Sequence, residues 1–271
     1  MRLILILTLT ISCVCAESVL SDERPLDAGY RQMYNLQFDA AHQTFGEWEQ
    51  QHPGDPLGPV SDAAAYLFSE LDRLHVFEGE FFLDSSFLTR RKLKADPAVK
   101  QRFDAALAQG GELADRILRS APQDHDAMFA KVMRFGLQAN YMALVEKRNL
   151  SALGDVKSSR QLAEKLLAEA PEFGDAYMAV GVENYLLGLL PAPLRWLLRA
   201  GGAQTDKAAG IEKIRLTAER GHYLQPYARV LLAVAALREK NPGRAREILT
   251  ELSREFPRNR LYAEQLSHLR P

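Results

Sequence analysis

Cysteine is almost absent from the chain. Only Cys13 and Cys15 occur among its 271 residues, and both lie within the first sixteen positions. A chain without that segment has no thiol, so it forms no disulfide and offers no cysteine nucleophile or metal ligand. We therefore expect packing alone to stabilise the folded protein.

Long apolar runs are also scarce, and the main one lies at the N-terminus. Arg2 precedes an apolar run from Leu3 to Val14, and small residues then lead into a polar stretch. This order is typical of a cleavable signal peptide, and the run is shorter than the roughly 20 apolar residues of a spanning helix. We predict a signal peptide at residues 1–16 and export to the periplasm or cell envelope. A retained anchor and a lipidated cysteine are the alternatives.

The chain has little net charge. Its formal value is -1 although 25% of the residues are charged, so no overall field favours nucleic acid. The one basic cluster, Arg90–Lys94, is interpreted as the solvated end of a helix, with contact to anionic lipid head groups as the alternative. We expect no nucleic-acid partner.

Motifs for catalysis and for metal binding are missing. The six histidines are scattered and lack the HxxxH, HxH or HExxH spacing of metal sites. The stretch Gly201–Lys207 lacks the spacing of a phosphate-binding loop, and no serine lies in a GxSxG or SxxK motif. The local cluster at 124–126 is interpreted as a helix start capped by Asp124 or Asp126. The sequence predicts no cofactor, no metal ion and no enzyme activity.

Helical periodicity is what the chain does contain. Apolar residues recur on one helical face, as at Leu224, Ala228, Leu231, Leu232 and Ala235. No sustained alternation of the kind that indicates a strand occurs. Similar proline-containing ends follow several helical segments, at Pro53, Pro122, Pro171 and Pro257. This pattern predicts an all-α fold built from recurrent helix pairs.

Two stretches share a spacing of small and large residues. The first contains Gly29, Phe38, Ala41, Phe45 and Pro53, and the second contains Asn241–Ala245, Leu249, Leu252 and Pro257. Small residues let paired helices approach closely, and large ones fill the space beside them. Both stretches resemble the tetratricopeptide repeat, best over residues of about 22–55 and 224–258. The resemblance implies a right-handed α-solenoid of irregular helix pairs over residues 17–271.

A second resemblance covers the C-terminal half. It depends on Gly181, on the apolar turn Leu189–Leu194, on Gly201-Gly202 and on the helix start Asp206–Ile211. In this order the residues resemble the eukaryotic inclusion-body-clearance family of outer-membrane repeat proteins. The resemblance implies helical repeats and proximity to a membrane.

Aromatic residues provide the candidate contact surface. The stretch Phe77–Phe87 holds four phenylalanines, which we expect to wedge between helix pairs, with an aromatic lip on a groove as the alternative. The residues predicted to contact a partner are Tyr30, Tyr34, Tyr141, Tyr177, Tyr185 and Trp196. Simple burial explains the spacing of Tyr177 and Tyr185 equally well.

The apolar stretch at residues 185–200 decides between two functions. Its two prolines, Pro191 and Pro193, argue against a spanning helix. We expect a buried corner joining two stacks of repeats, in which Gly201 or Gly202 ends one helix and Thr205 caps the next. An exposed lip facing a partner or a membrane is the alternative.

These observations predict an exported, non-enzymatic scaffold that presents a concave groove to a protein or peptide partner. The alternative is a membrane- or lipid-associated envelope assembly factor that uses the apolar segment at 185–200 and makes peripheral membrane contact.

Overall fold

The computed structural model describes residues 25–76, 93–188 and 192–269. In these stretches the chain is helical and contains no β-strand, so the predicted all-α class is confirmed. The predicted signal peptide, the stretch Phe77–Phe87 and most of the basic cluster Arg90–Lys94 lie outside the described residues, as does Pro191.

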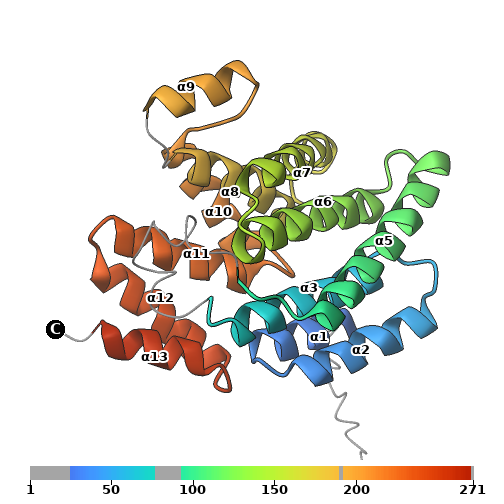
Figure 1. Ribbon diagram of the computed structural model, residues 1–271, viewed down its shortest axis with the longest axis horizontal. Helices are drawn as coiled ribbons and strands as arrows, with labels where there is room; N and C mark the ends of the chain where they lie inside the picture. The colour runs from blue at the N-terminus through green and yellow to red at the C-terminus, as the bar shows by residue number, and fades with distance from the viewer. Residues whose placement is uncertain (1–24, 77–92, 189–191, 270–271) are drawn as a thin grey trace, which may run out of the picture.

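The described residues form twelve α-helices (Figure 1). They are α1 (Pro25–Tyr34), α2 (Phe38–Gln51), α3 (Leu57–Arg73), α5 (Pro97–Ser120), α6 (His125–Asn140), α7 (Asn149–Glu169), α8 (Tyr177–Gly188), α9 (Ala192–Ala200), α10 (Lys207–Arg220), α11 (Gln225–Arg238), α12 (Pro242–Glu255) and α13 (Arg260–His268). A π-helical turn, Tyr141–Val145, follows α6, and a 3₁₀ turn, Gly174–Ala176, precedes α8.

Helix starts are fixed by short polar side chains. Asp124 accepts a hydrogen bond of 2.8 Å from the Ala127 N–H, so its predicted role as a helix cap is confirmed. Asn241 and Asn259 cap α12 and α13 in the same way. The cap of α10 is Asp206, not the predicted Thr205, whose hydroxyl instead accepts a hydrogen bond from Arg199.

Helix ends follow the prolines as predicted. The helices α2, α5, α7 and α12 each end two residues before a proline, at Gln51, Ser120, Glu169 and Glu255 respectively. Proline cannot donate its backbone N–H and restricts the residue before it, so the helical ladder stops there.

Each of these helices packs against the next one along the chain, except α9. Small residues allow the close approach. A Cβ placed on Gly29 of α1 would lie 2.3 Å from the ring of Phe45 on α2, and Ala41 and Ala245 are completely buried. The predicted small–large packing is therefore present in both of the best-matched stretches.

A close crossing joins α8 to α10. A Cβ on Gly210 would lie 2.4 Å from the backbone nitrogen of Tyr185, and one on Gly181 would lie 2.8 Å from Ile214. The sequence from Asp206 to Gly210 thus has a structural reason: the aspartate starts α10, and the glycine lets it touch the backbone of α8.

Because α8 and α10 touch directly, α9 is displaced from the helix packing. Figure 1 shows it set apart from the remaining helices, and the side chain of Trp196 is 74% exposed. The predicted buried corner is therefore wrong at α9, and the alternative of an exposed lip describes it. The predicted helix end is confirmed, since Gly202 adopts a φ of +83° after the last turn.

The two ends of the described chain meet. The hydroxyl of Tyr34 at the end of α1 donates 3.0 Å to the carbonyl of Tyr223, just before α11. At the start of α13, Arg260 forms an ion pair of 2.7 Å with Asp72 on α3. The first helices thus lie beside the last ones, as Figure 1 shows for α1 to α3 and α11 to α13.

Candidate functional site

A cavity of about 130 Å³ lies among the inner helices. Its wall comes from α1, α3, α6, α7, α8 and α11, so segments from both ends of the chain line one space. Its larger lining side chains are Tyr30, Met33, Tyr34, Phe68, Met133, Met178 and Tyr227. The room between them is left by small residues, namely Ala64, Gly136, Ala139, Ala143 and Ala179. We call this space the central cavity.

Several polar groups in the wall are already bonded within the protein. The Ser61 hydroxyl donates 3.0 Å to the hydroxyl of Tyr30, and the Ser159 hydroxyl donates 2.8 Å to the carbonyl of Val132. Tyr34 donates to a carbonyl, as described above. Burial raises the pKa of Tyr30 and of Tyr34 well above the ordinary value of 10.0, so both hydroxyls keep their protons at neutral pH.

Asp175 is the one carboxylate that lines the central cavity, and it is almost fully buried. It accepts hydrogen bonds from the backbone N–H groups of His222, Tyr223 and Leu224, at 2.9, 3.1 and 2.8 Å. Burial raises its pKa, and the three N–H donors oppose that shift. Its bonds connect the start of α8 with the turn before α11, so its role is to hold the wall together.

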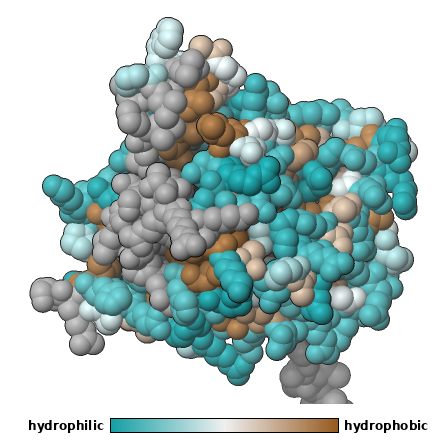
Figure 2. Space-filling view, in the orientation of Figure 1, coloured by the Kyte–Doolittle hydropathy of each residue, from teal (hydrophilic) through white to brown (hydrophobic). Residues whose placement is uncertain are grey.

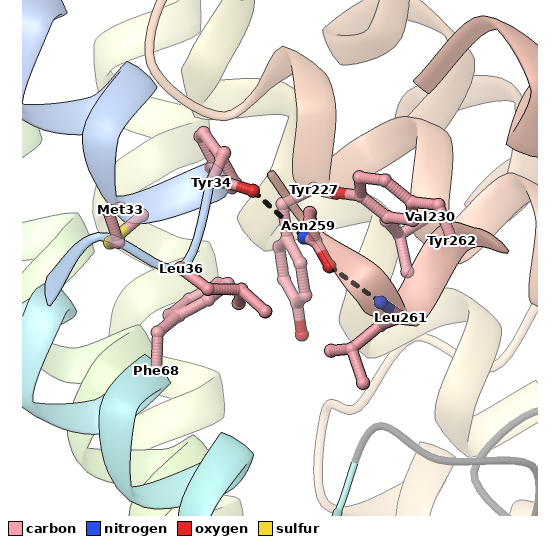
Figure 3. A pocket seen from close by; sticks show the side chains of 9 residues that line it. All are labelled: Met33, Tyr34, Leu36, Phe68, Tyr227, Val230, Asn259, Leu261 and Tyr262. Carbon is pink, nitrogen blue, oxygen red and sulfur yellow. Dashed lines mark hydrogen bonds between the residues drawn. The ribbon is translucent and has the colours of Figure 1, made fainter. Parts of the chain in front are cut away.

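A smaller pocket lies beside the central cavity, at the meeting of the chain ends (Figure 3). Met33, Tyr34 and Phe68 line both spaces, whereas Leu261 and Tyr262 of α13 belong to the smaller one. The figure shows residues from the N-terminal helices on one side and from the C-terminal helices on the other. Asn259 bridges them through hydrogen bonds to Tyr34 and Leu261.

The C-terminal end of α8 joins the central cavity to the surface. Leu186 lines the cavity, yet its side chain is 40% exposed. Two residues later the carbonyl of Gly188 accepts a hydrogen bond of 3.2 Å from Arg195 of α9. Figure 2 shows apolar surface beside the α9 region on a face that is otherwise largely hydrophilic. The exposed arm α9 therefore begins at the rim of the cavity.

The connection after α9 is fixed by a polar network. Arg160 of α7 is buried and pairs with the buried Glu183 of α8, while also donating 3.2 Å to the carbonyl of Gly202. Gln204 bonds to Asn184 and to Glu164, each at 2.6 Å. Burial raises the pKa of Glu183, against the effect of the neighbouring guanidinium. These bonds give α9 a fixed base.

The predicted contact residues fall into four groups. Tyr30 and Tyr34 line the central cavity, and Trp196 is exposed on α9. Tyr141 and Tyr185 are buried away from the cavity lining, where Tyr141 stacks on Phe103 at 4.9 Å. Tyr177 lies near the surface and donates 3.0 Å to the carbonyl of Pro171. The structure thus brings only the first two together.

Sequence reasoning missed the matching residues from the C-terminal half. The ring of Tyr223 stacks on Tyr30 at 4.7 Å, and Tyr227 lies against Phe68 at 5.6 Å. A signal for them exists, because Tyr223 and Tyr227 repeat the four-residue spacing of Tyr30 and Tyr34. The spacing alone does not show that the two pairs meet; the stacking of Tyr223 on Tyr30 shows it.

No family model matches the chain, and a search of curated proteins finds no match either. In the part of the chain that the structure describes, no group of three or more His, Cys, Asp or Glu side chains could hold a metal ion. Within the same residues no helix has the length and apolar character needed to cross a membrane. The geometry of the central cavity and of α9 is therefore the basis for interpreting function.

Proposed function

We propose that the protein is a non-enzymatic, exported scaffold of the tetratricopeptide type that binds a protein or peptide partner at its concave side. In this proposal the helices form a right-handed solenoid of five irregular pairs, closed by α13. The pairs are α1 with α2, α3 with α5, α6 with α7, α8 with α10, and α11 with α12.

The observation that supports the proposal is the composition of the central cavity wall. The first helix of each of the five pairs contributes to it. Repeat solenoids use the first helices of successive units to build a concave binding surface, and here that surface is apolar and aromatic. The contacts of α8 with α10 also make α9 an insertion between the two helices of one pair.

Site-specific cross-linking in cells tests this function. A photo-reactive residue replaces Leu186 at the rim of the central cavity, and the matched control replaces Ala108, which is exposed on α5 and does not line the cavity. We expect one defined protein, identified by mass spectrometry, to be captured from position 186 and not from position 108. Equal products from both positions, or none from either, would contradict the proposal.

A second candidate function follows from α9. Its side chains Arg195 and Arg199 form no ion pair with any described residue, and they flank the exposed Trp196. Tryptophan and arginine in this arrangement favour the interface of an anionic membrane. In this candidate the protein is a peripheral envelope assembly factor, and the arm is its point of contact.

Flotation with vesicles that contain anionic lipid tests the second candidate. We expect binding by the wild-type chain and loss of binding by Trp196→Asp, which places a negative charge where the ring meets the lipid. Leu150→Asp is the matched control, because Leu150 is 86% exposed on another helix. If the wild-type chain stays in the soluble fraction, the candidate fails.

A further inference from the structure

We infer that the central cavity takes one uncharged apolar side chain of the partner, about as large as a benzene ring. This inference rests on the proposed function and adds the chemistry of the group that is recognised. It depends on the volume of the cavity, on the bonding of its polar wall groups and on the position of its mouth.

The volume limits the size of the guest. An engineered apolar cavity of about 150 Å³ stays dry and binds benzene, and the central cavity has about 130 Å³. A phenylalanine ring or a branched aliphatic side chain has a comparable size. A long acyl chain is several times longer than a benzene ring, so most of it would lie outside this volume.

The wall limits the polarity of the guest. The hydroxyls of Tyr34 and Ser159 donate hydrogen bonds within the protein, the carboxylate of Asp175 accepts three, and the hydroxyl of Tyr30 accepts one from Ser61. The lining side chains of Asn140 and Tyr227 are polar but neutral, and they make no hydrogen bond with another described residue. A charged guest would lose its water, and the charged lining side chain, Asp175, already accepts three backbone hydrogen bonds, so burying a charge here costs free energy. The mainly apolar lining offers few partners for the polar groups of a peptide backbone, so a side chain fits this space better than a backbone segment does.

The mouth indicates that the guest belongs to a larger molecule. Leu186 is part of the wall and is also exposed, and the arm α9 with Trp196 begins a few residues further along the chain. Apolar surface therefore continues outward from the cavity. A partner that inserts one side chain can cover this outer surface with its neighbouring residues, as anchor residues do in protein interfaces.

Methionine methyl groups provide a direct test with benzene as the probe. Met33, Met133 and Met178 line the central cavity, whereas Met128 and Met142 are buried outside its lining. In methyl NMR spectra of the labelled full chain, we expect benzene to shift the first three signals and to leave the other two unchanged. Absence of shifts, or equal shifts of all five signals, would overturn the inference.

Variants in which a larger side chain fills the cavity test whether benzene binds there. Ala179→Leu and Gly136→Leu place a larger side chain into it from α8 and α6, so that one variant remains informative if the other fails to fold. We expect either to raise the Kd for benzene at least roughly tenfold, because the leucine occupies the space that benzene needs. Ala108→Leu makes the same change at an exposed position and should leave the Kd unchanged.

A second ligand separates the inference from a lipid site. Dodecanoate that shifts the same methyl signals at lower concentration than benzene would overturn the inference in favour of an acyl chain. The cross-linking experiment tests the proposed function independently of benzene binding. If benzene binds but no partner is cross-linked at position 186, both the scaffold function and the partner side chain are contradicted. A cross-linked partner without benzene binding would contradict only the apolar anchor.

Discussion

The side-chain amide of Asn259 donates a hydrogen bond of 2.8 Å to the backbone carbonyl of Tyr34, which lies 225 residues earlier in the chain. The same asparagine accepts a bond of 3.0 Å from the Leu261 N–H and so caps α13. One buried side chain thus starts the last helix and attaches it to the end of the first one. The wall of the central cavity depends on this attachment, because Tyr34 is part of that wall.

Replacing Asn259 by alanine should therefore remove two contributions at once. Loss of the cap costs about 1 kcal/mol, and loss of the donor to a buried carbonyl adds roughly 1–2 kcal/mol. We expect the free energy of unfolding, measured with urea, to fall by roughly 2–3 kcal/mol.

Asn241→Ala is the matched control for that variant. Asn241 caps α12 through a bond of 3.1 Å from the Arg244 N–H, but it is exposed, and its side chain makes no hydrogen bond with the described residues of α1. It should lose only about 1 kcal/mol. Equal losses for the two variants would show that the contact between the chain ends adds nothing to stability.

The bonds of Asp175 predict a larger and more local effect. Asp175→Ala leaves three backbone N–H groups before α11 without their acceptor, and we expect a loss of roughly 3 kcal/mol or more. The amide hydrogens of His222, Tyr223 and Leu224 should exchange faster in Asp175→Ala than in Asp124→Ala. The second variant removes only one cap bond, at the start of α6. Unchanged exchange at His222–Leu224 would contradict the role given to this carboxylate.

Sequence predicted the local parts of the fold well. Helix ends before prolines and the cap at Asp124 depend on neighbours within a few residues, and such neighbours are visible in a sequence. The bond from Asn259 to Tyr34 has no local pattern, because its acceptor is a backbone carbonyl far along the chain. The cavity wall was only partly predicted for the same reason, since Leu224 and Tyr227 reach it from the opposite end of the chain.

The arm α9 shows a different limit of sequence reasoning. Its apolar residues predicted burial, but whether they are buried depends on the space available at that point of the fold. Gly181 and Gly210 bring α8 and α10 into backbone contact, so no room is left between these helices. A prediction that treats glycines as helix breakers does not reveal this exclusion.

A glycine inside this crossing and a glycine outside it should respond to substitution in opposite ways. Gly210→Ala places a Cβ 2.4 Å from the Tyr185 backbone nitrogen and should cost roughly 1–3 kcal/mol through forced separation of the helices. Gly154→Ala on α7 meets nothing within 4 Å and should stabilise the protein by about 0.5–1 kcal/mol, because alanine favours the helix. Thermal unfolding of both variants distinguishes them. Destabilisation by Gly154→Ala, or none by Gly210→Ala, would contradict the packing described.

Tyr227 predicts a dependence of stability on alkaline pH. Burial raises its pKa from the ordinary 10.0 to about 12. The unfolded chain therefore releases this proton first, and the contribution of the hydroxyl to stability is complete below pH 10 and is lost as the pH rises toward 12. We expect Tyr227→Phe to reduce the loss of unfolding free energy between pH 9 and roughly pH 11.

The control for this prediction is Tyr177→Phe. Tyr177 also donates a hydrogen bond, to the Pro171 carbonyl, but its hydroxyl is exposed to solvent. The Tyr177→Phe variant retains Tyr227, so it should lose as much stability at alkaline pH as the wild-type chain. Other buried tyrosines with raised pKa, such as Tyr34 and Tyr262, remain in both variants, so the difference between them reports on Tyr227 alone. If Tyr227→Phe and the wild-type chain lose the same free energy over this range, the ring of Tyr227 is not shielded from water, and the apolar wall between α3 and α11 is less closed than the structure shows.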